Sequence, residues 1–285
     1  MTILGIDIIE VATVNLRMTL KIIAMVTVLM SIIDYLEQRY SEKIKAIITN
    51  RPLVQILSAS LLGAVPGCMD AFLVVSLYIH GTVGFGALTA VMLSTAGDEA
   101  FIMLTMIPDD TLKIIAVTAA LGVIGGIVAE KAAAVLHLEF DRSCNFKTRE
   151  TEQKKGFLKD HVIDHILLEH VPRLFLWIFI PLTVIDLLTL EFDFASYVSG
   201  MPVLVLMVFA ALVGIIPESG PHLVFVILYS KGLISLPVLI VSTLSQDGHG
   251  LLPLLSHSVK DTLYVQFFTT AFSLIVGIVL YAVGF

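Results

Sequence analysis

Two stretches of the chain place acidic and imidazole side chains inside otherwise apolar sequence. The motif STAGDE carries Asp98 and Glu99, and the motif SQDGHG in the second half of the chain carries Asp247 and His249. Carboxylate and imidazole groups bind divalent transition metals, and acids buried in a membrane also relay protons. These residue types therefore predict a pathway for a cation, for protons, or for both.

A second pair of motifs places polar residues directly after Gly–Pro breaks. The motif GAVPGCMD brings Cys68 and Asp70, and the motif GIIPESGPH brings Glu218, Ser219 and His222. Proline and glycine end a helix, and the next helix then begins with exposed N–H groups. Helix capping would explain Ser219 and Asp70 but not Cys68 or His222. All five residues therefore remain candidate ligands, with capping as the alternative reading.

The acids in these motifs need a compensating positive charge. Each intramembrane carboxylate costs about 2.5–3.5 kcal/mol on insertion scales. The sequence has no Lys or Arg between Pro52 and Asp110, and it has one, Lys231, between Arg173 and Lys260. A bound cation or protons must supply the charge, unless the acids are permanently protonated and hydrogen-bonded. The candidate metal ligands are Cys68, Asp70, Asp98, Glu99, Glu218, Ser219, His222, Asp247 and His249.

The motifs recur at a fixed spacing along the chain. Pro66 returns as Pro217 and Ser94 returns as Ser245, in each case 151 residues later. Asp110-Thr111-Leu112 likewise returns 151 residues later as Asp-Thr-Leu. A duplicated hydrophobic half with interrupted helices in corresponding places is the strongest sequence indication of a transport site.

The composition is that of a polytopic membrane protein. The 285 residues are 57% hydrophobic and 14% charged, which argues against a soluble enzyme. A net charge of −7 gives no electrostatic support for nucleic-acid binding. We predict spanning helices at 17–37, 111–136, 166–190 and 261–283, and stretches broken near their middle at 52–80, 83–107, 199–230 and 233–257.

The predicted fold class is all-α, a membrane protein of two inverted repeats, each with broken or re-entrant helices. The organisation is a first transmembrane repeat at 1–136, a polar cytoplasmic connector at 137–160 and a second repeat at 161–285. Basic residues concentrate at 39–51 and 137–160, which predicts that both segments face the cytoplasm. The first helices of the two halves then enter from opposite sides. A change in the number of crossings in one interrupted segment would make the repeats parallel instead.

A further polar cluster precedes the second repeat. It predicts either a metal-collecting surface in the cytoplasm or a solvated helix end. Its members are His161, Asp164, His165, Glu169 and His170.

The four motifs together resemble those of a known family. GAVPGC and GIIPESGPH, with STAGDE and SQDGHGLLPLL, are similar to prokaryotic membrane proteins described as manganese transporters, also called ten-helix heavy-metal exporters or arsenic-efflux-like proteins. The resemblance runs from about Leu16 to Phe285. It implies metal export, with the substrate pathway at Pro66-Gly67-Cys68, Asp98-Glu99, Pro217-Glu218-Ser219, His222, Asp247 and His249. The long His-rich insertion of some members is absent, which leaves the 161–170 cluster to collect metal.

We expect a secondary transporter that exports divalent transition-metal cations, manganese-like but with zinc, iron or cobalt also compatible. Alternating access and proton coupling are expected, because the sequence lacks a GxxxxGK[ST] nucleotide-binding motif. The alternatives are an oxyanion transporter that uses half-helix N-termini, and an intramembrane metalloenzyme that uses Asp247 and His249. Neither HExxH nor GxSxG is present, so enzymatic activity is not expected.

The remaining expectations concern partners and location. The expected partners are the metal ion and the lipid bilayer, and a homodimer is compatible with the sequence. No nucleic acid and no cofactor beyond the transported metal is expected. The predicted location is the prokaryotic cytoplasmic membrane, as an integral membrane protein.

Overall fold

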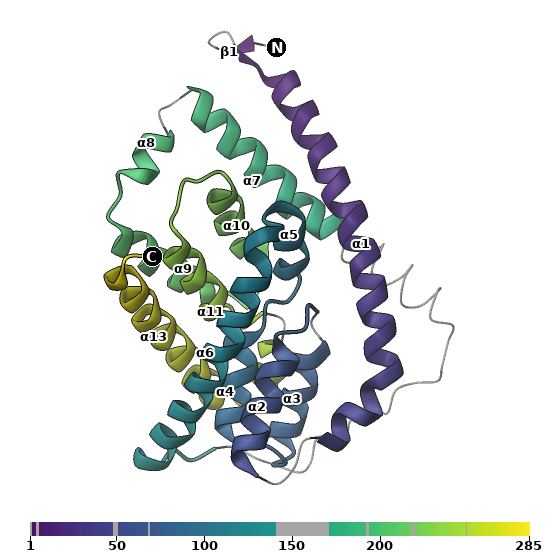
Figure 1. Cartoon of the computed structure of the whole chain (residues 1–285), viewed down its shortest axis with the longest axis vertical. Helices are drawn as coiled ribbons and strands as arrows, with labels where there is room; N and C mark the ends of the chain where they lie inside the picture. Colours follow the sequence, from purple (N-terminus) through teal and green to yellow (C-terminus); the bar gives the residue numbers. More distant parts are fainter. Residues whose placement is uncertain are drawn as a thin grey trace.

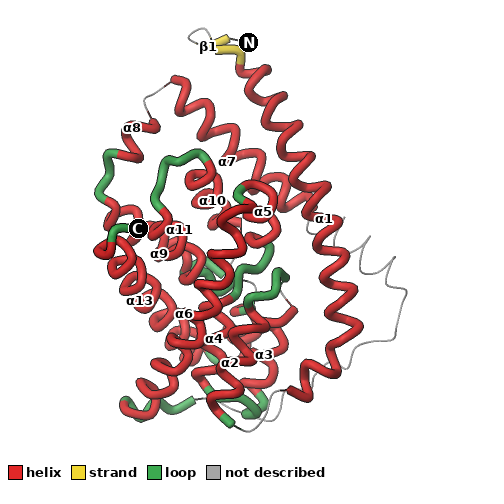
Figure 2. Tube along the Cα trace, viewed as in Figure 1, coloured by secondary structure: helices red, strands yellow, loops and turns green. Residues whose placement is uncertain are grey.

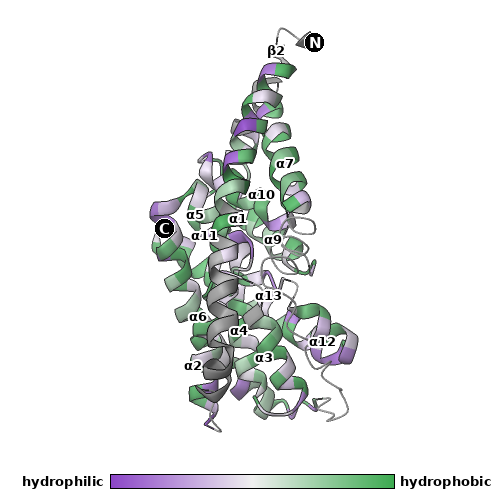
Figure 3. Ribbon diagram, turned by 90° about the vertical axis from the view of Figure 1, so that its right-hand side faces the viewer, coloured by the Kyte–Doolittle hydropathy of each residue, from purple (hydrophilic) through white to green (hydrophobic). Residues whose placement is uncertain are grey.

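The computed structural model describes residues 2–3, 6–47, 51–67, 69–140, 171–191, 194–217, 220–248 and 250–285. In these segments the fold is helical apart from one short antiparallel ladder between β1 (Thr2–Ile3) and β2 (Ile6–Asp7) (Figure 2). Within the described ranges, the apolar runs long enough to cross a membrane are Phe85–Met106, Pro108–Val135 and Val259–Val283. Hydrophobic residues colour most of helices such as α7 and α3 (Figure 3). The predicted all-α membrane fold is confirmed.

The first half contains a long helix, two broken stretches and a second long helix. Its helices are α1 (Ile8–Ile47), α2 (Pro52–Gly63), α3 (Met69–Ile79), α4 (Phe85–Ser94), α5 (Glu99–Met106) and α6 (Pro108–Val135). Prolines occupy the first helical positions of α2 and α6, where a missing N–H costs nothing. The predicted breaks in 52–80 and 83–107 are confirmed. The predicted helix 17–37 was too short, because α1 continues beyond this apolar run at both ends, to a length of 40 residues.

The second half repeats this plan after one additional short helix. Its helices are α7 (Val171–Glu191), α8 (Phe194–Ser199), α9 (Val203–Gly214), the 3-10 turn η2 (Gly220–His222), α10 (Leu223–Ser230), α11 (Leu236–Ser245), α12 (Leu251–His257) and α13 (Val259–Val283). The prediction of one stretch from 199 to 230 did not anticipate α8, a helix of six residues.

The element boundaries repeat at the sequence offset of 151 residues. Helix α9 begins and ends 151 residues after α2, and α11 does so relative to α4. The combined span of η2 and α10 matches α3 in the same way, and α13 begins 151 residues after α6. The turns also match, since Gly81 and Gly232 both have φ +70°. The duplication visible in the sequence therefore extends to local backbone conformation.

The packing is repeated as well. Helix α4 lies between α2 and α6, and α11 lies between α9 and α13. Close approach depends on small residues in both halves. A Cβ on Gly63 would lie 2.3 Å from the Ser94 hydroxyl, and a Cβ on Gly214 would lie 2.3 Å from the Ser245 hydroxyl. Glycine at these two positions lets the end of α2 pack on the end of α4, and the end of α9 on the end of α11.

The two halves contact each other through two equivalent pairs of helices, and each pair has one helix from each half. Helix α3 packs on α12, and its counterpart α10 packs on α5. Helices α1 and α7 also lie side by side and run in opposite directions (Figure 1). Helix α6 runs from the upper half of the view to its lower end, whereas α13 runs back up to the C-terminus (Figure 1).

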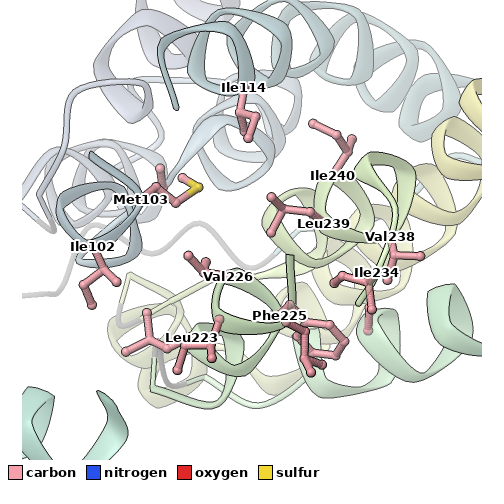
Figure 4. Packing of buried hydrophobic residues seen from close by; sticks show 14 of the residues in the cluster. Ile102, Met103, Ile114, Leu223, Phe225, Val226, Ile234, Val238, Leu239 and Ile240 are labelled. Carbon is pink, nitrogen blue, oxygen red and sulfur yellow. The ribbon is translucent and has the colours of Figure 1, made fainter. Parts of the chain in front are cut away.

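Buried side chains fill the contact between α5 and the second half (Figure 4). Ile102 and Met103 of α5 face the same interior as Val226 of α10 and Leu239 of α11. All four are fully buried. In a lipid environment such packing, rather than exclusion of water, holds helices together. The result is a rigid support for the two breaks that precede α5 and α12.

Candidate functional site

The break between α4 and α5 places two acids inside the protein. Gly97 turns the chain with φ 45°, a conformation that favours glycine, and Asp98 and Glu99 follow at once. Asp98 is 3% exposed and Glu99 is fully buried. Asp98 occupies the N-cap position of α5, but its side chain makes no capping hydrogen bond. Side-chain capping therefore does not account for the acid at position 98.

Glu99 is joined to the opposite half by a hydrogen bond. The Gln246 side-chain Nε2 donates to Glu99 Oε2. Glu99 Oε1 has no partner in the described part of the chain. The Thr243 hydroxyl lies beside this carboxyl but donates instead to the Leu239 carbonyl at 3.0 Å. One carboxylate oxygen therefore remains available inside the protein.

The sequence reasoning did not single out Gln246. It is the polar residue between Ser245 and Asp247 in the second break, so its position in that motif was a usable signal. An amide can donate to a carboxylate and still accept from another group, which suits a residue that holds an acid in place. Its partner could not be deduced, because Glu99 lies 147 residues away.

Asp247 is the second buried acid without a hydrogen-bond partner. It is 1% exposed, and neither carboxylate oxygen has a partner in the described residues. The Thr269 hydroxyl of α13 lies beside it but donates to the Gln266 carbonyl at 3.2 Å. An unpaired polar atom is costly to bury, so two such oxygens indicate a site that a cation or a proton completes.

His222 is a further buried candidate ligand, with one unpaired ring nitrogen. It ends η2 and is fully buried, with its Nδ1 3.2 Å from the Ser242 hydroxyl of α11. The other ring nitrogen, Nε2, has no partner in the chain as described. A hydrogen bond at one imidazole nitrogen fixes the ring and leaves the other nitrogen to bind a metal or a proton.

The repeat places Glu99 and His222 at equivalent positions to Gly250 and Ala71. At the interface of α3 and α12, a Cβ on Gly250 would lie 2.6 Å from the Ala71 side chain. The repeat equivalents of Gly250 and Ala71 are Glu99, at the start of α5, and His222, directly before α10; α5 and α10 are the corresponding pair of helices. One interface between the halves is thus closed by two small residues, and its counterpart carries an acid and an imidazole.

Several predicted site residues fall outside the described residues. These are Cys68, Glu218, Ser219 and His249, together with the whole 161–170 cluster. Asp70 lies in the first turn of α3, but its side chain is outside the description. Among the described side chains, no group of three or more His, Cys, Asp or Glu is placed to hold a metal ion. The described candidates are Asp98, Glu99, His222 and Asp247, all of them buried, with Gln246 bonded to Glu99 and Ser242 to His222.

The comparison with protein families identifies the family of the chain. The sequence pattern of the family described as "Putative, 10TM heavy-metal exporter" matches residues 10–202 and 191–284. The chain belongs to this family. No curated protein and no solved structure matches the chain. Membership of this exporter family supports metal transport as the general function of this multi-span membrane protein.

Proposed function

We propose that the protein is a secondary transporter that exports divalent transition-metal cations, manganese-like in preference, by alternating access with proton coupling. The cation passes between the halves at the breaks before α5 and α12. The observation behind this proposal is the contact between the halves at Glu99 and Gln246, which we call the seam. There Gln246 donates to Glu99 from the other half, and one Glu99 carboxylate oxygen stays unpaired in the described residues.

The balance of charge at this seam supports a positive substrate. Glu99 and Asp247 are buried acids, and together they leave three carboxylate oxygens without a described partner. Lys231, the one basic residue between Arg173 and Lys260, is paired with Asp186 of α7. A divalent ion would supply the missing charge, and protons would supply it when the ion has left.

The mixture of ligands supports a transition metal. Carboxylates suit manganese, whereas imidazole is also used for zinc, iron and cobalt. His222 contributes one free nitrogen and the acids contribute oxygens. Replacement of the bound metal by protons on the same carboxylates gives a direct route to proton antiport.

The arrangement of the halves supports alternating access. We infer that they are inverted repeats, because equivalent helices α6 and α13 run in opposite directions (Figure 1). The basic segment 39–51 includes the last turns of α1, and the connector at 137–160 comes after α6; both helices end toward the lower end of that view. This end would face the cytoplasm of a prokaryotic cell. Rocking of one repeat against the other would expose the seam to each side in turn.

An oxyanion substrate is less compatible with these groups. Anion sites in proteins use Lys, Arg or clustered N–H donors. The sequence has no Lys or Arg between Pro52 and Asp110. The acids at Glu99 and Asp247 would repel an anion.

The deciding experiment is metal flux in proteoliposomes with an imposed pH gradient. Purified protein is compared with Glu99→Gln and Asp247→Asn for uptake of radioactive manganese. Each substitution keeps the size of the side chain and removes one carboxylate charge, so we expect at least a tenfold loss of flux. Glu139→Gln and Asp109→Asn make the same chemical changes at exposed residues and should keep the flux of the parent.

Equal flux in all five proteins would overturn the assignment of the site. Flux of phosphate or arsenite in place of metals would overturn the substrate class. Collapse of the pH gradient during metal uptake, measured with an enclosed pH-sensitive dye, would support coupling. A metal flux that leaves the gradient unchanged would exclude it.

A further inference from the structure

Two tyrosine–aspartate hydrogen bonds join the halves. In the first bond the tyrosine comes from the first half and the aspartate from the second, and in the second bond this is reversed. Tyr78 at the end of α3 donates to Asp261 Oδ2 in the first turn of α13, at 2.9 Å. Tyr229 at the end of α10 donates to Asp110 Oδ2 in the first turn of α6, at 3.0 Å. Both Tyr229 and Asp261 lie 151 residues after their equivalents, so each bond is the repeat counterpart of the other.

The two bonds lie toward opposite ends of the molecule. Helix α6 begins in the upper half of the view, and α13 begins in the lower half (Figure 1). Each aspartate lies in the first turn of its helix, so the pair at Asp110 is near one end and the pair at Asp261 near the other. Between them lie the breaks that carry the candidate site.

The first pair, Tyr78 with Asp261, is closed off from the surroundings. Both side chains are fully buried. The Phe140 ring packs edge-on against Tyr78 at 6.3 Å between ring centres, and it stacks on Phe85 at 4.9 Å. Tyr264 of α13 meets the same Phe140 ring edge-on. The Phe140 ring thus packs against this pair, and Phe85 and Tyr264 in turn pack against Phe140.

The second pair, Tyr229 with Asp110, is open. The Asp110 side chain is 40% exposed, and its other oxygen contacts Lys113 at 3.1 Å. Tyr229 is only half-buried. The repeat equivalents of Phe85 and Tyr264 are the non-aromatic Leu236 and Lys113. The same hydrogen bond therefore exists in a packed form at one end and an exposed form at the other.

We propose that these pairs are the two gates of the transport cycle. The first pair closes the cytoplasmic end and the second pair closes the outer end. The inference rests on the proposed function, since it needs a substrate that passes between the halves. It adds the residues that decide which side the seam faces.

The physical argument comes from the exchange of partners. In a transporter built from inverted repeats, the inward-open and outward-open states differ by which half adopts which of two arrangements. Where two equivalent contacts differ in burial, we take the buried contact to lie on the side that is closed. Loss of one gate lowers the stability of the state that it closes, and so shifts the population toward the opposite state.

The test uses a cysteine reporter at the seam. Ala96 is fully buried in the break before α5 and is the repeat equivalent of Asp247. Ala96→Cys is made in a background in which Cys68 and Cys144 are replaced by serine, so that the reporter is the sole thiol. Labelling by a membrane-impermeant maleimide is timed separately in inside-out and right-side-out vesicles.

Tyr78→Phe and Tyr229→Phe remove one hydroxyl each and serve as matched controls for each other. We expect Tyr78→Phe to raise labelling from the cytoplasmic side about tenfold, the size of effect of one hydrogen bond to a charged group. Tyr229→Phe should raise labelling from the outer side instead. The double variant should return the ratio of the two rates toward that of the parent.

Labelling rates that rise on opposite sides in the two single variants, with a ratio that returns to that of the parent in the double variant, support the two gates. Equal effects of both variants on the same side, no effect of either, or a reporter that never reacts from either side would overturn them. Should either phenylalanine variant aggregate, Asp261→Asn and Asp110→Asn weaken the same bonds. The labelling needs no metal, so reciprocal shifts without metal flux would retain the gates and reject the proposed cargo.

Discussion

Gln246 donates a hydrogen bond to Glu99 across the boundary between the two halves of the chain. The acid begins helix α5, and the amide follows helix α11. Each residue belongs to a break in its own half, so this bond fixes the position of one break relative to the other. The affinity of the site for its ion, and its selectivity among ions, should both depend on this hydrogen bond.

Removal of the amide should weaken both folding and transport. Gln246→Leu leaves the buried Glu99 carboxylate without its donor, which should cost about 1–3 kcal/mol of stability. We expect a lower melting temperature in detergent and a loss of manganese flux per folded molecule. Gln55→Leu is the control. Gln55 bonds the Thr82 carbonyl and the Gly84 N–H, and the second half already has Leu206 at the equivalent position. It should lower stability without changing flux per folded molecule.

Loss of the serine beside the imidazole should reduce metal affinity. Ser242→Val removes the hydroxyl that lies 3.2 Å from His222 Nδ1, and valine is the residue at the equivalent position 91. Partners of metal-binding histidines typically contribute about 10–100-fold to metal affinity. Isothermal titration with Mn²⁺ should show a decrease of this order. Ser273→Ala removes another buried hydroxyl, one that bonds only its own helix at Thr270, and should bind as the parent does. Equal affinities in both variants would show that the Ser242 hydroxyl does not support metal binding at His222.

Alanine at either glycine before a break should destabilise the fold. Gly63→Ala and Gly214→Ala each bring a Cβ to 2.3 Å from a serine hydroxyl and within 2.8 Å of a backbone carbonyl. Overpacking of this kind costs about 1–3 kcal/mol. The measurement is the melting temperature of the detergent-solubilised protein. Gly81→Asn is the control, because its site is open and asparagine tolerates φ +70°. Similar melting temperatures for all three variants would show that the helices can move apart.

The two halves should respond differently at the start of their central helices. Glu130 Oε2 accepts the Gly86 N–H at 2.6 Å, which satisfies one free donor at the start of α4. The equivalent residues are Tyr281 and Pro237, and proline has no N–H. Glu130→Ala should therefore cost about 1–2 kcal/mol, and Glu130→Gln should cost less because it keeps an acceptor. Tyr281→Phe should change little. Thermal unfolding of the three variants decides this, and a loss in Tyr281→Phe equal to that in Glu130→Ala would contradict it.

Much of the fold could be predicted from the sequence because its signals are local. Gly–Pro pairs and the polar motifs marked the breaks, and the structure places turns at 64–67 and at 95–98. The length of α1 was missed because hydropathy detects the apolar part of a helix and not its polar ends. Helix α8 was missed for a related reason, since six residues are too few to show a period.

The site could be predicted only in part, because its decisive contacts join distant residues. Burial of Glu99, His222 and Asp247 followed from their apolar surroundings, and the structure confirms it. The roles of Gln246 and Tyr78 depend on partners 147 and 183 residues away, and no spacing rule reaches so far. The role of all nine candidates as metal ligands stays a prediction, and the side chains of Cys68, Asp70, Glu218, Ser219 and His249 lie outside the description.

The small residues at one interface have a consequence for how such a chain could arise. Two identical copies of the first half would set Glu99 against Ala71 at both interfaces, and two copies of the second would set His222 against Gly250 at both. Neither assembly could bring the acid to the imidazole. An acid on one side of an interface and an imidazole on the other therefore require two halves that differ in sequence, so the divergence of the repeats is itself part of the candidate site.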